Sequence, residues 1–149
     1  MKKTIGFSLL EIIVVLSLIG VILGAFLFRM GGFSDLTRSE TARGDLRAIK
    51  RAIESYYLNL RVNGSYKYPA GADWQNNDLV NDNPRVLRQK LYDPFRAANT
   101  EYSYYLSSNT KYYVAFSYGP NRNADITGIS DTGALTGSVG DDIYVTNGS

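Results

Sequence analysis

The side chains of this chain that could do chemistry are carboxylates, because histidine and cysteine are both absent. Their absence excludes thiolate nucleophiles, imidazole bases, disulfides and thiolate zinc sites. The stretch 119–149 is rich in glycine, asparagine and serine, and its acidic side chains are Asp125, Asp131, Asp141 and Asp142. Carboxylates, amide oxygens and carbonyls on a flexible loop are the ligands of a hard cation such as calcium. The stretch therefore predicts either a calcium site or a solvated acidic loop.

The overall composition is that of an ordinary folded protein. The 149 residues have room for one domain and one accessory segment. A formal net charge of +2 is too small to indicate nucleic-acid binding. The chain lacks a phosphate-cradling loop. Adjacent carboxylates such as Asp141 and Asp142, on a flexible segment, make a poorly preorganised acid–base pair, so we expect no enzyme.

One further carboxylate, Glu11, lies near the start of a long apolar run. The run extends from Phe7 to Phe28 and follows the basic residues Lys2 and Lys3. As a helix it would measure roughly 33 Å, enough to cross a bilayer with the N-terminus in the cytoplasm. An acidic side chain within a membrane segment costs about 2.5–3.5 kcal/mol and is usually functional.

Three interpretations of this N-terminus compete. A cleaved secretory signal needs a small-residue site after the apolar run, and the sequence from Arg29 to Phe33 matches one poorly. A plain membrane anchor leaves Glu11 unexplained. Cleavage between Gly6 and Phe7 would instead place the new ammonium group of Phe7 near the Glu11 carboxylate of a neighbouring subunit. Attraction between these charges in a low-dielectric setting would fix the axial register between subunits.

The stretch from Lys2 to Leu16 resembles the N-terminus of the type IV filament superfamily, which comprises type IV pilins and the pseudopilins of type II secretion systems. The matching features are a short basic leader, Gly6, Phe7, and Glu11 at the fifth mature position. The resemblance implies that residues 1–6 are a leader, removed after Gly6 by a membrane-embedded prepilin peptidase that also N-methylates Phe7. It implies a single-pass inner-membrane subunit with a cytoplasmic N-terminus, which later packs its helix into the core of a periplasmic or extracellular filament.

Helical periodicity continues beyond the apolar run. We expect a transmembrane and filament-core helix over 7–33, followed by an amphipathic helix over 34–62 that ends before Asn63-Gly64. The amphipathic part has one apolar stripe that should pack on a sheet. Its members are Leu46, Ile49, Ile53, Tyr56 or Tyr57, and Leu60. Its basic residues fit a solvated face, or else salt bridges between subunits.

The remaining chain predicts the other half of an α+β domain, which spans 34–149. Residues 63–100 are a polar, turn-rich loop in which Trp74 anchors the loop to the core and Arg85–Leu91 forms a short helix. Two tyrosine-rich runs within 101–118 predict an antiparallel hairpin. At this spacing the tyrosines are typical of a sheet face packed on a helix rather than of a stacking platform. The C-terminal loop covers 119–149.

Two segments strengthen the resemblance to major pseudopilins in particular. Asp93-Pro94-Phe95, followed by the hairpin, is similar to their Asp-Pro-Trp-Gly segment and hairpin, with a departure at Phe95 and Arg96. The C-terminal stretch is similar to their calcium-binding loop, with asparagine in place of one aspartate. The resemblance implies a pilin-like fold with a calcium-ordered loop. Its implied ligands are the Tyr118 carbonyl and the side chains of Asn121, Asp141 and Asp142, with Asp125 or Asp131 compensating for the lost charge at Asn121.

The resemblance implies a structural function. It indicates a major pseudopilin that polymerises into a periplasmic filament and helps to drive folded proteins through an outer-membrane channel. The implied partners are other copies of the chain, minor pseudopilins, the prepilin peptidase, an inner-membrane assembly platform and a cytoplasmic ATPase motor. A surface type IV pilus for adhesion, motility or DNA uptake is the alternative within the superfamily. The lack of cysteine favours the pseudopilin, because many surface type IV pilins close their C-terminal region with a disulfide.

An alternative of another class is a membrane-anchored domain that binds glycan or DNA through its tyrosine-rich surface. Glu11 argues against this alternative, since an anchor has no use for a buried carboxylate. We therefore expect no nucleic-acid partner.

Overall fold

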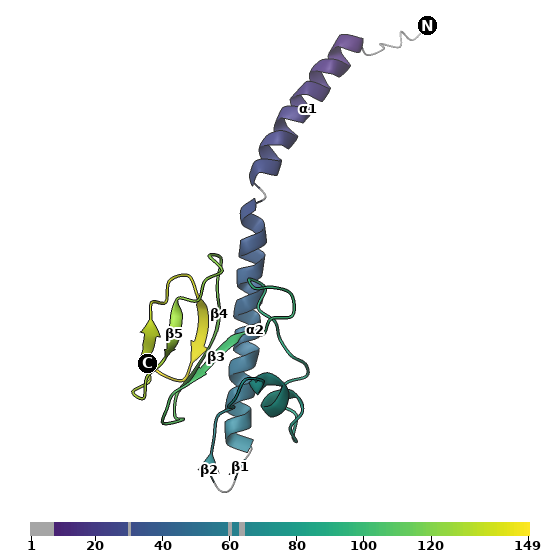
Figure 1. Ribbon diagram of the computed structural model, residues 1–149. Helices are drawn as coiled ribbons and strands as arrows, with labels where there is room; N and C mark the ends of the chain where they lie inside the picture. Colours follow the sequence, from purple (N-terminus) through teal and green to yellow (C-terminus); the bar gives the residue numbers. More distant parts are fainter. Residues whose placement is uncertain (1–7, 30, 60, 63–64) are drawn as a thin grey trace. The chain divides into compact units, whose positions relative to one another are not determined.

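The chain folds as an α+β protein, with two N-terminal helices followed by short antiparallel strands (Figure 1). The computed structural model describes residues 8–29, 31–59, 61–62 and 65–149. The chain divides into two compact units, residues 1–36 and 37–149. The helices are α1 (Leu9–Arg29), α2 (Gly31–Asn59) and the π-helical turn η1 (Gln75–Val80). The strands are β1 (Arg61–Val62), β2 (Ser65–Tyr66), β3 (Ser103–Leu106), β4 (Tyr113–Ser117), β5 (Ile126–Ile129), β6 (Leu135–Gly137) and β7 (Ile143–Thr146).

Helix α1 exposes its large apolar side chains over the range from Leu9 to Leu23. The large hydrophobic residues from Leu9 to Leu23 are between 46% and 76% exposed. Ser17 donates a hydrogen bond to the Ile13 carbonyl one turn earlier, which satisfies its hydroxyl within the helix. Counted over the described residues alone, no helix is both long and apolar enough to cross a membrane.

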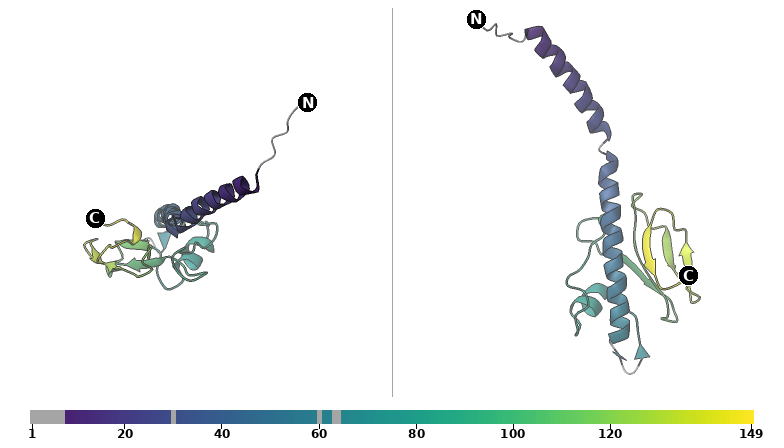
Figure 2. Two further views of the ribbon diagram at one scale, coloured as in Figure 1. Left: turned by 90° about the horizontal axis from the view of Figure 1, so that it is seen from above. Right: turned by 180° about the vertical axis from the view of Figure 1, so that it is seen from behind.

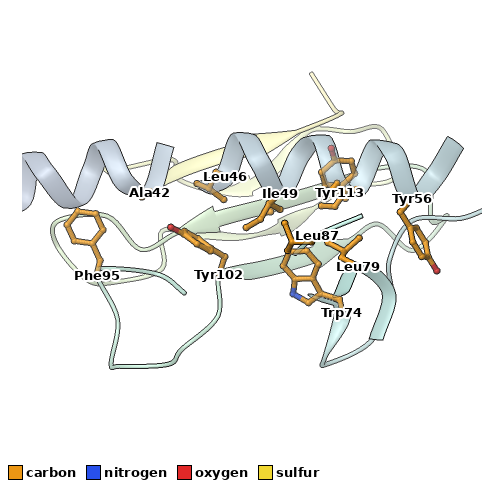
Figure 3. Close-up of a cluster of buried hydrophobic side chains, with 13 residues drawn as sticks. Ala42, Leu46, Ile49, Tyr56, Trp74, Leu79, Leu87, Phe95, Tyr102 and Tyr113 are labelled. Atoms are coloured by element: carbon orange, nitrogen blue, oxygen red, sulfur yellow. The ribbon is translucent and has the colours of Figure 1, made fainter. Parts of the chain in front are cut away.

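The globular unit is built around the apolar stripe of α2. Ala42, Leu46, Ile49, Ile53 and Tyr56 follow one another at spacings of three and four residues, and all are buried. Figure 3 shows several of them pointing from the helix toward side chains of the following segments. These partners are Trp74, Leu79, Leu87, Phe95, Tyr102, Tyr113 and Ala115. The predicted packing of this helix on a small antiparallel sheet is confirmed, and Leu60 lies outside the described residues.

Strand β4 is buried on both faces and forms the centre of the unit. It pairs antiparallel with β3 on one side and with β7 on the other. Tyr113 and Ala115 face the α2 core, while Val114 and Phe116 pack against Ile126 of β5. The β5–β6 hairpin therefore covers the side of the sheet that α2 leaves open. The predicted hairpin over 101–118 is confirmed, with Tyr104 opposite Ala115.

The segment between α2 and β3 differs from expectation at two points. Helix α2 ends at Asn59 rather than at residue 62, because Arg61–Val62 pairs with Ser65–Tyr66. Asn63-Gly64, interpreted as a helix stop, is also a dipeptide typical of tight hairpins. The expected helix at Arg85–Leu91 is absent, and a helical turn forms at Gln75–Val80 instead.

The backbone of 85–91 forms hydrogen bonds with η1 in place of the hydrogen bonds of a helix. The backbone N–H groups of Val86 and Leu87 donate to the Leu79 carbonyl at 3.1 and 2.8 Å. Gln75 is fully buried, and its amide both accepts from the Leu91 N–H at 2.9 Å and donates to the Leu91 carbonyl at 3.2 Å. Trp74 stacks on Tyr104 with 4.5 Å between ring centroids, which places it as the predicted anchor of this loop.

The C-terminal stretch 119–149 is more ordered than a loop. It contains three strands, of which β5 and β6 form a hairpin and β7 joins the sheet beside β4. The C-terminal strands and the η1 segment flank α2 on opposite sides, both in Figure 1 and in the right-hand view of Figure 2. Lys50 of α2 donates from Nζ to the Thr146 carbonyl of β7 at 3.0 Å, which ties the last strand to the helix.

Three tyrosines in the sheet or directly before it are held in environments that favour the neutral phenol. Burial raises the pKa of Tyr102, Tyr104 and Tyr113 well above the usual value of 10.0. The carboxylate of Asp45, which accepts a hydrogen bond from the Tyr102 hydroxyl at 3.0 Å, adds to the effect at that residue. Glu54 adds to it at Tyr113.

We expect the globular unit to lose stability above pH 10. A raised pKa in the folded state means that these phenols contribute stability that is fully present below pH 10 and is lost as the pH rises further. Phenolate absorbance and circular dichroism of residues 34–149, recorded together during an alkaline titration, measure this. A set of tyrosines should ionise only as the dichroism is lost, and Tyr104→Phe should shrink that absorbance step. Complete ionisation of a still-folded chain would contradict the prediction.

Candidate metal centre

Three carboxylates of the C-terminal stretch converge at one point of the globular unit. Asp125 comes directly before β5, while Asp141 and Asp142 come directly before β7. Each offers a carboxylate oxygen, and these oxygens all lie within 4.8 Å of one another. The pairing of β7 with β4, and the return of β5 and β6 across the sheet, bring the two segments together.

Backbone N–H groups fix the orientation of two of these carboxylates. Oδ2 of Asp142 accepts from the N–H groups of Asp125 and Ile126 at 2.9 and 2.8 Å. Oδ2 of Asp141 accepts from the N–H of Asn121 at 2.7 Å. In both residues the second oxygen, Oδ1, is buried and has no hydrogen-bond partner in the described part of the chain. An orphaned buried oxygen is costly, and here two of them belong to one acidic cluster.

The electrostatics of Asp142 reflect this crowding. The residue is only 6% exposed. Burial raises the pKa of its carboxyl above the usual value, the N–H bonds from Ile126 and Asp125 act in the opposite direction, and the nearby carboxylates of Asp125 and Asp141 raise it further. The ionised form of Asp142 is therefore disfavoured in the folded unit unless a positive charge compensates it.

Two glycines allow the segments to approach this closely. Gly119 has φ of +64°, and a Cβ added there would lie 2.2 Å from the backbone oxygen of Asp141. Gly140 has φ of +51°, and a Cβ there would lie 1.9 Å from Oδ2 of Asp125. Only glycine fits at either position without displacing the acidic cluster.

Two of the other residues expected at the site, Asn121 and Asp131, are placed differently, and the expected role of the Tyr118 carbonyl stays a prediction. Asn121 is present, but its Oδ1 accepts from the Asn123 N–H at 2.7 Å, so that its amide Nδ2 faces Asp125 Oδ2 at 3.1 Å. The structure thus brings a hydrogen-bond donor of Asn121, not its side-chain oxygen, to the cluster. Tyr118 follows β4 directly, and its N–H donates to Asp93. Asp131 lies in the turn between β5 and β6, where its Oδ1 accepts from the Asn109 N–H at 2.8 Å.

Asp93 appears in the sequence only as part of a short motif, yet it has a structural role next to the candidate metal centre. The residue is 3% exposed. Its Oδ1 accepts from Ser117 Oγ at 2.6 Å and from the Phe95 N–H at 3.0 Å, and its Oδ2 accepts from the Tyr118 N–H at 3.0 Å. Asp93 thereby holds the end of β4, from which the chain continues into the acidic cluster. Two features of the sequence point to this role of Asp93. One is its place directly before a proline, and the other is the later apolar strand that ends in Ser117.

The geometry suits a hard divalent cation. Three carboxylates, two of them with an unpartnered oxygen, provide anionic oxygen ligands, and carbonyls and water complete the six to eight ligands that calcium takes. Such a cation would neutralise the charge that disfavours ionised Asp142. It would also join the starts of β5 and β7. The candidate side-chain ligands are therefore Asp125, Asp141 and Asp142.

The N-terminal candidates are only partly within the described residues. Gly6 and Phe7, the expected cleavage site, lie outside them. Glu11 lies in the first turn of α1, where its side chain is exposed among apolar neighbours such as Ile12 and Val15. The chain matches no protein-family model, no curated protein and no solved structure.

We expect calcium to stabilise the globular unit and Asp142→Asn to abolish the effect. A ligand that binds only the folded state at 100 times its dissociation constant adds about 2.7 kcal/mol to the free energy of unfolding. Asparagine keeps one acceptor oxygen for the N–H groups of Asp125 and Ile126 but removes the disfavoured charge. The variant should therefore melt at the same temperature as the metal-free parent, or above it, and respond little to calcium.

The measurement is calorimetric melting of residues 34–149 with calcium, with magnesium and with a chelator. Asp131→Asn is the matched control, because it makes the same chemical change at an aspartate outside the cluster. It should keep the full response to calcium. An equal response of Asp142→Asn and Asp131→Asn would show that calcium binds elsewhere.

Proposed function

We propose that this chain is a structural subunit of a type IV filament, most like the major pseudopilin of a type II secretion system. The observation that carries the proposal is α1, whose large apolar side chains from Leu9 to Leu23 are all at least 46% exposed. An apolar surface of this extent needs a cover of lipid or of other protein. A filament subunit uses both covers in turn, the membrane before assembly and other copies of α1 afterwards.

The globular unit and α1 have separate roles in this proposal. Among the described residues, the core of the globular unit is made by side chains from Ala42 onward. On this proposal the globular unit folds around its own core, and α1 serves assembly. The apolar run of the sequence, Phe7 to Phe28, extends beyond the described residues at its N-terminal end.

Glu11 is the feature that distinguishes a filament helix from a simple anchor. It is the one ionisable side chain between Lys3 and Arg29 in the sequence. On this proposal the leader is removed after Gly6, Phe7 is methylated, and the ammonium group of one subunit pairs with Glu11 of the next. The pair forms in an apolar surrounding, where opposite charges attract strongly. It sets how far one subunit is displaced along the filament from its neighbour.

The choice of a pseudopilin within the superfamily rests on the C-terminal segment. The chain has no cysteine, so this segment cannot be closed by a disulfide. The cluster of Asp125, Asp141 and Asp142 provides a metal-based alternative. The proposed partners are further copies of the chain, minor pseudopilins, a prepilin peptidase, an inner-membrane assembly platform and its cytoplasmic ATPase. On this proposal the chain catalyses no reaction, and calcium is structural.

Glu11→Ala should block assembly without blocking removal of the leader. Loss of one partner of a buried ion pair costs about 3–5 kcal/mol, which predicts a decrease of about tenfold or more in sheared filaments. Filaments are quantified by immunoblot after shearing, and leader removal by intact mass, in cells that supply the assembly machinery. Glu40→Ala is the control, since Glu40 is an exposed carboxylate of α2.

The outcomes separate the classes of function. Wild-type filaments that require Glu11 but not Glu40 support the proposal. If wild-type chains form no filaments, or if Glu11→Ala assembles as well as the wild type, a membrane-anchored binding domain becomes the better explanation. Filaments that appear on the cell surface at native expression would assign the chain to a surface pilus instead of a secretion pseudopilus.

A further inference from the structure

A second depression of the globular unit has the opposite charge to the metal centre. It measures about 460 Å³ and is lined by three arginines, Arg38 of α2, Arg96 after the Asp93-Pro94 turn, and Arg122 after β4. Its other walls are neutral, namely Pro94, Phe95, Ala97 and Tyr118. Among the described residues, no carboxylate lines it. Three guanidinium groups therefore share one concave site with no anionic side chain among its described lining residues.

Within the described part of the chain, Arg96 and Arg122 have no local counter-charge, unlike several other basic residues of the unit. Arg43 pairs with Glu40, Lys50 with Glu54, and Lys90 with both Asp73 and Glu101. Among the described residues, neither Arg96 nor Arg122 has a carboxylate within 4.0 Å. The buried carboxylate of Asp93 lies beneath the same segment, but its oxygens already accept from Ser117, Phe95 and Tyr118.

Arg96 is held in place by contacts that leave much of its hydrogen-bonding capacity unused. The Arg96 guanidinium lies 4.3 Å above the centre of the Tyr118 ring. Its Nη1 donates to the Glu101 carbonyl and to Ser103 Oγ at 3.3 and 3.4 Å. Among the described residues, Nε and Nη2 of Arg96 have no acceptor. A guanidinium has five N–H donors, so most remain for a ligand.

Arg122 is placed by its backbone. Its N–H donates to the Gly119 carbonyl at 3.1 Å, and its φ of +61° completes a tight turn directly after β4. The preceding residue, Asn121, is tied to Asp141 through its own N–H. The side chain of Arg122 is exposed and makes no hydrogen bond or ion pair with the described residues. The turn thus presents a guanidinium that the fold does not use.

We propose that Arg38, Arg96 and Arg122 form a binding site for a phosphate group. Guanidinium groups bind phosphate through paired N–H donors in a geometry that matches its oxygens. A free phosphate monoester can carry two negative charges and offers three terminal oxygens. The phosphodiester of a phospholipid headgroup carries one charge and offers two terminal oxygens. Both can accept paired N–H donors from a guanidinium group, which is the chemistry that they share. The site goes beyond the filament function and does not depend on it.

The first test is a titration of the full chain in zwitterionic detergent with inorganic phosphate. Nuclear magnetic resonance of the arginine Nε–H groups should show saturable shifts at Arg96 and Arg122, absent with chloride at equal ionic strength. Arg122→Gln should weaken phosphate binding by about tenfold, since a hydrogen bond to a charged group is typically of that size. Arg88→Gln, the control, removes the same charge from an exposed residue outside the depression and should have little effect.

The second test identifies the source of the phosphate. The full chain is placed in nanodiscs of phosphatidylcholine with or without phosphatidylglycerol, and hydrogen exchange of 94–97 and 118–122 is compared. Protection that requires phosphatidylglycerol and is lost in Arg122→Gln assigns a lipid headgroup. Saturable binding of inorganic phosphate without such protection assigns a free phosphate ester.

Three results would overturn the proposal. The first is a titration that does not saturate. The second is equal weakening by Arg88→Gln and Arg122→Gln, which would indicate only diffuse attraction by net charge. The third is a response of the arginines to filament assembly alone, with none to phosphate, which would make the depression a contact for a neighbouring subunit. Since phosphate binding is measured without filaments, its failure would leave the filament proposal untouched.

Discussion

The buried carboxylate of Asp93 is the interaction on which both candidate sites depend. Its two oxygens accept three hydrogen bonds, from Ser117, Phe95 and Tyr118, at 2.6 to 3.0 Å. Burying a charge is costly unless it is hydrogen-bonded in this way. The bonds join the turn after Asp93 to the last residues of β4. On one side of this junction lies the arginine depression, and on the other the chain turns into the acidic cluster.

A second constraint is the burial of β4 on both faces. A strand in this position must offer apolar or large aromatic side chains on each face, and Tyr113 to Phe116 do so. The consequence is that α2 and the β5–β6 hairpin pack on opposite sides of one small sheet. The core of the unit is then closed by its own residues. This is why an apolar helix such as α1 can remain exposed without leaving the domain incomplete.

The sequence predicts those elements whose structure depends on residues that are close together in the chain. The stripe of α2 and the β3–β4 hairpin follow from periodicity and from a short turn, and both are present. The predictions from the sequence fail where the structure depends on pairing between residues that are far apart in the chain. Strand β7 is ordered by β4, which precedes it by about thirty residues, and its polar flanks resemble a loop. Likewise, the apolar spacing of 85–91 fits a helix, yet its N–H groups donate to the Leu79 carbonyl and to Gln75 Oε1.

The candidate site shows the same limit. Composition identifies an acidic segment but not which of its carboxylates meet. Asp125 and Asp131 lie at opposite ends of β5, a strand of four residues. At roughly 3.3 Å per residue, a strand of that length separates them by more than 10 Å. Only one of them can therefore lie beside Asp141 and Asp142, and the hairpin determines that it is Asp125. The orientation of Asn121 is set by the N–H of Asn123, a contact that residue types alone do not reveal.

The acidic cluster and the arginine depression are neighbours in the chain, because Asn121 bonds to Asp141 and Arg122 follows it directly. A cation bound at the first site and an anion bound at the second would attract each other. Each would also order the same turn. Both effects favour binding of the second ligand, so the coupling between the two proposed sites would be positive, and by linkage it would be reciprocal. A C-terminal segment held by two such ligands and by β7 is closed at several points without a covalent bond, which is the form of closure open to a chain that has no cysteine.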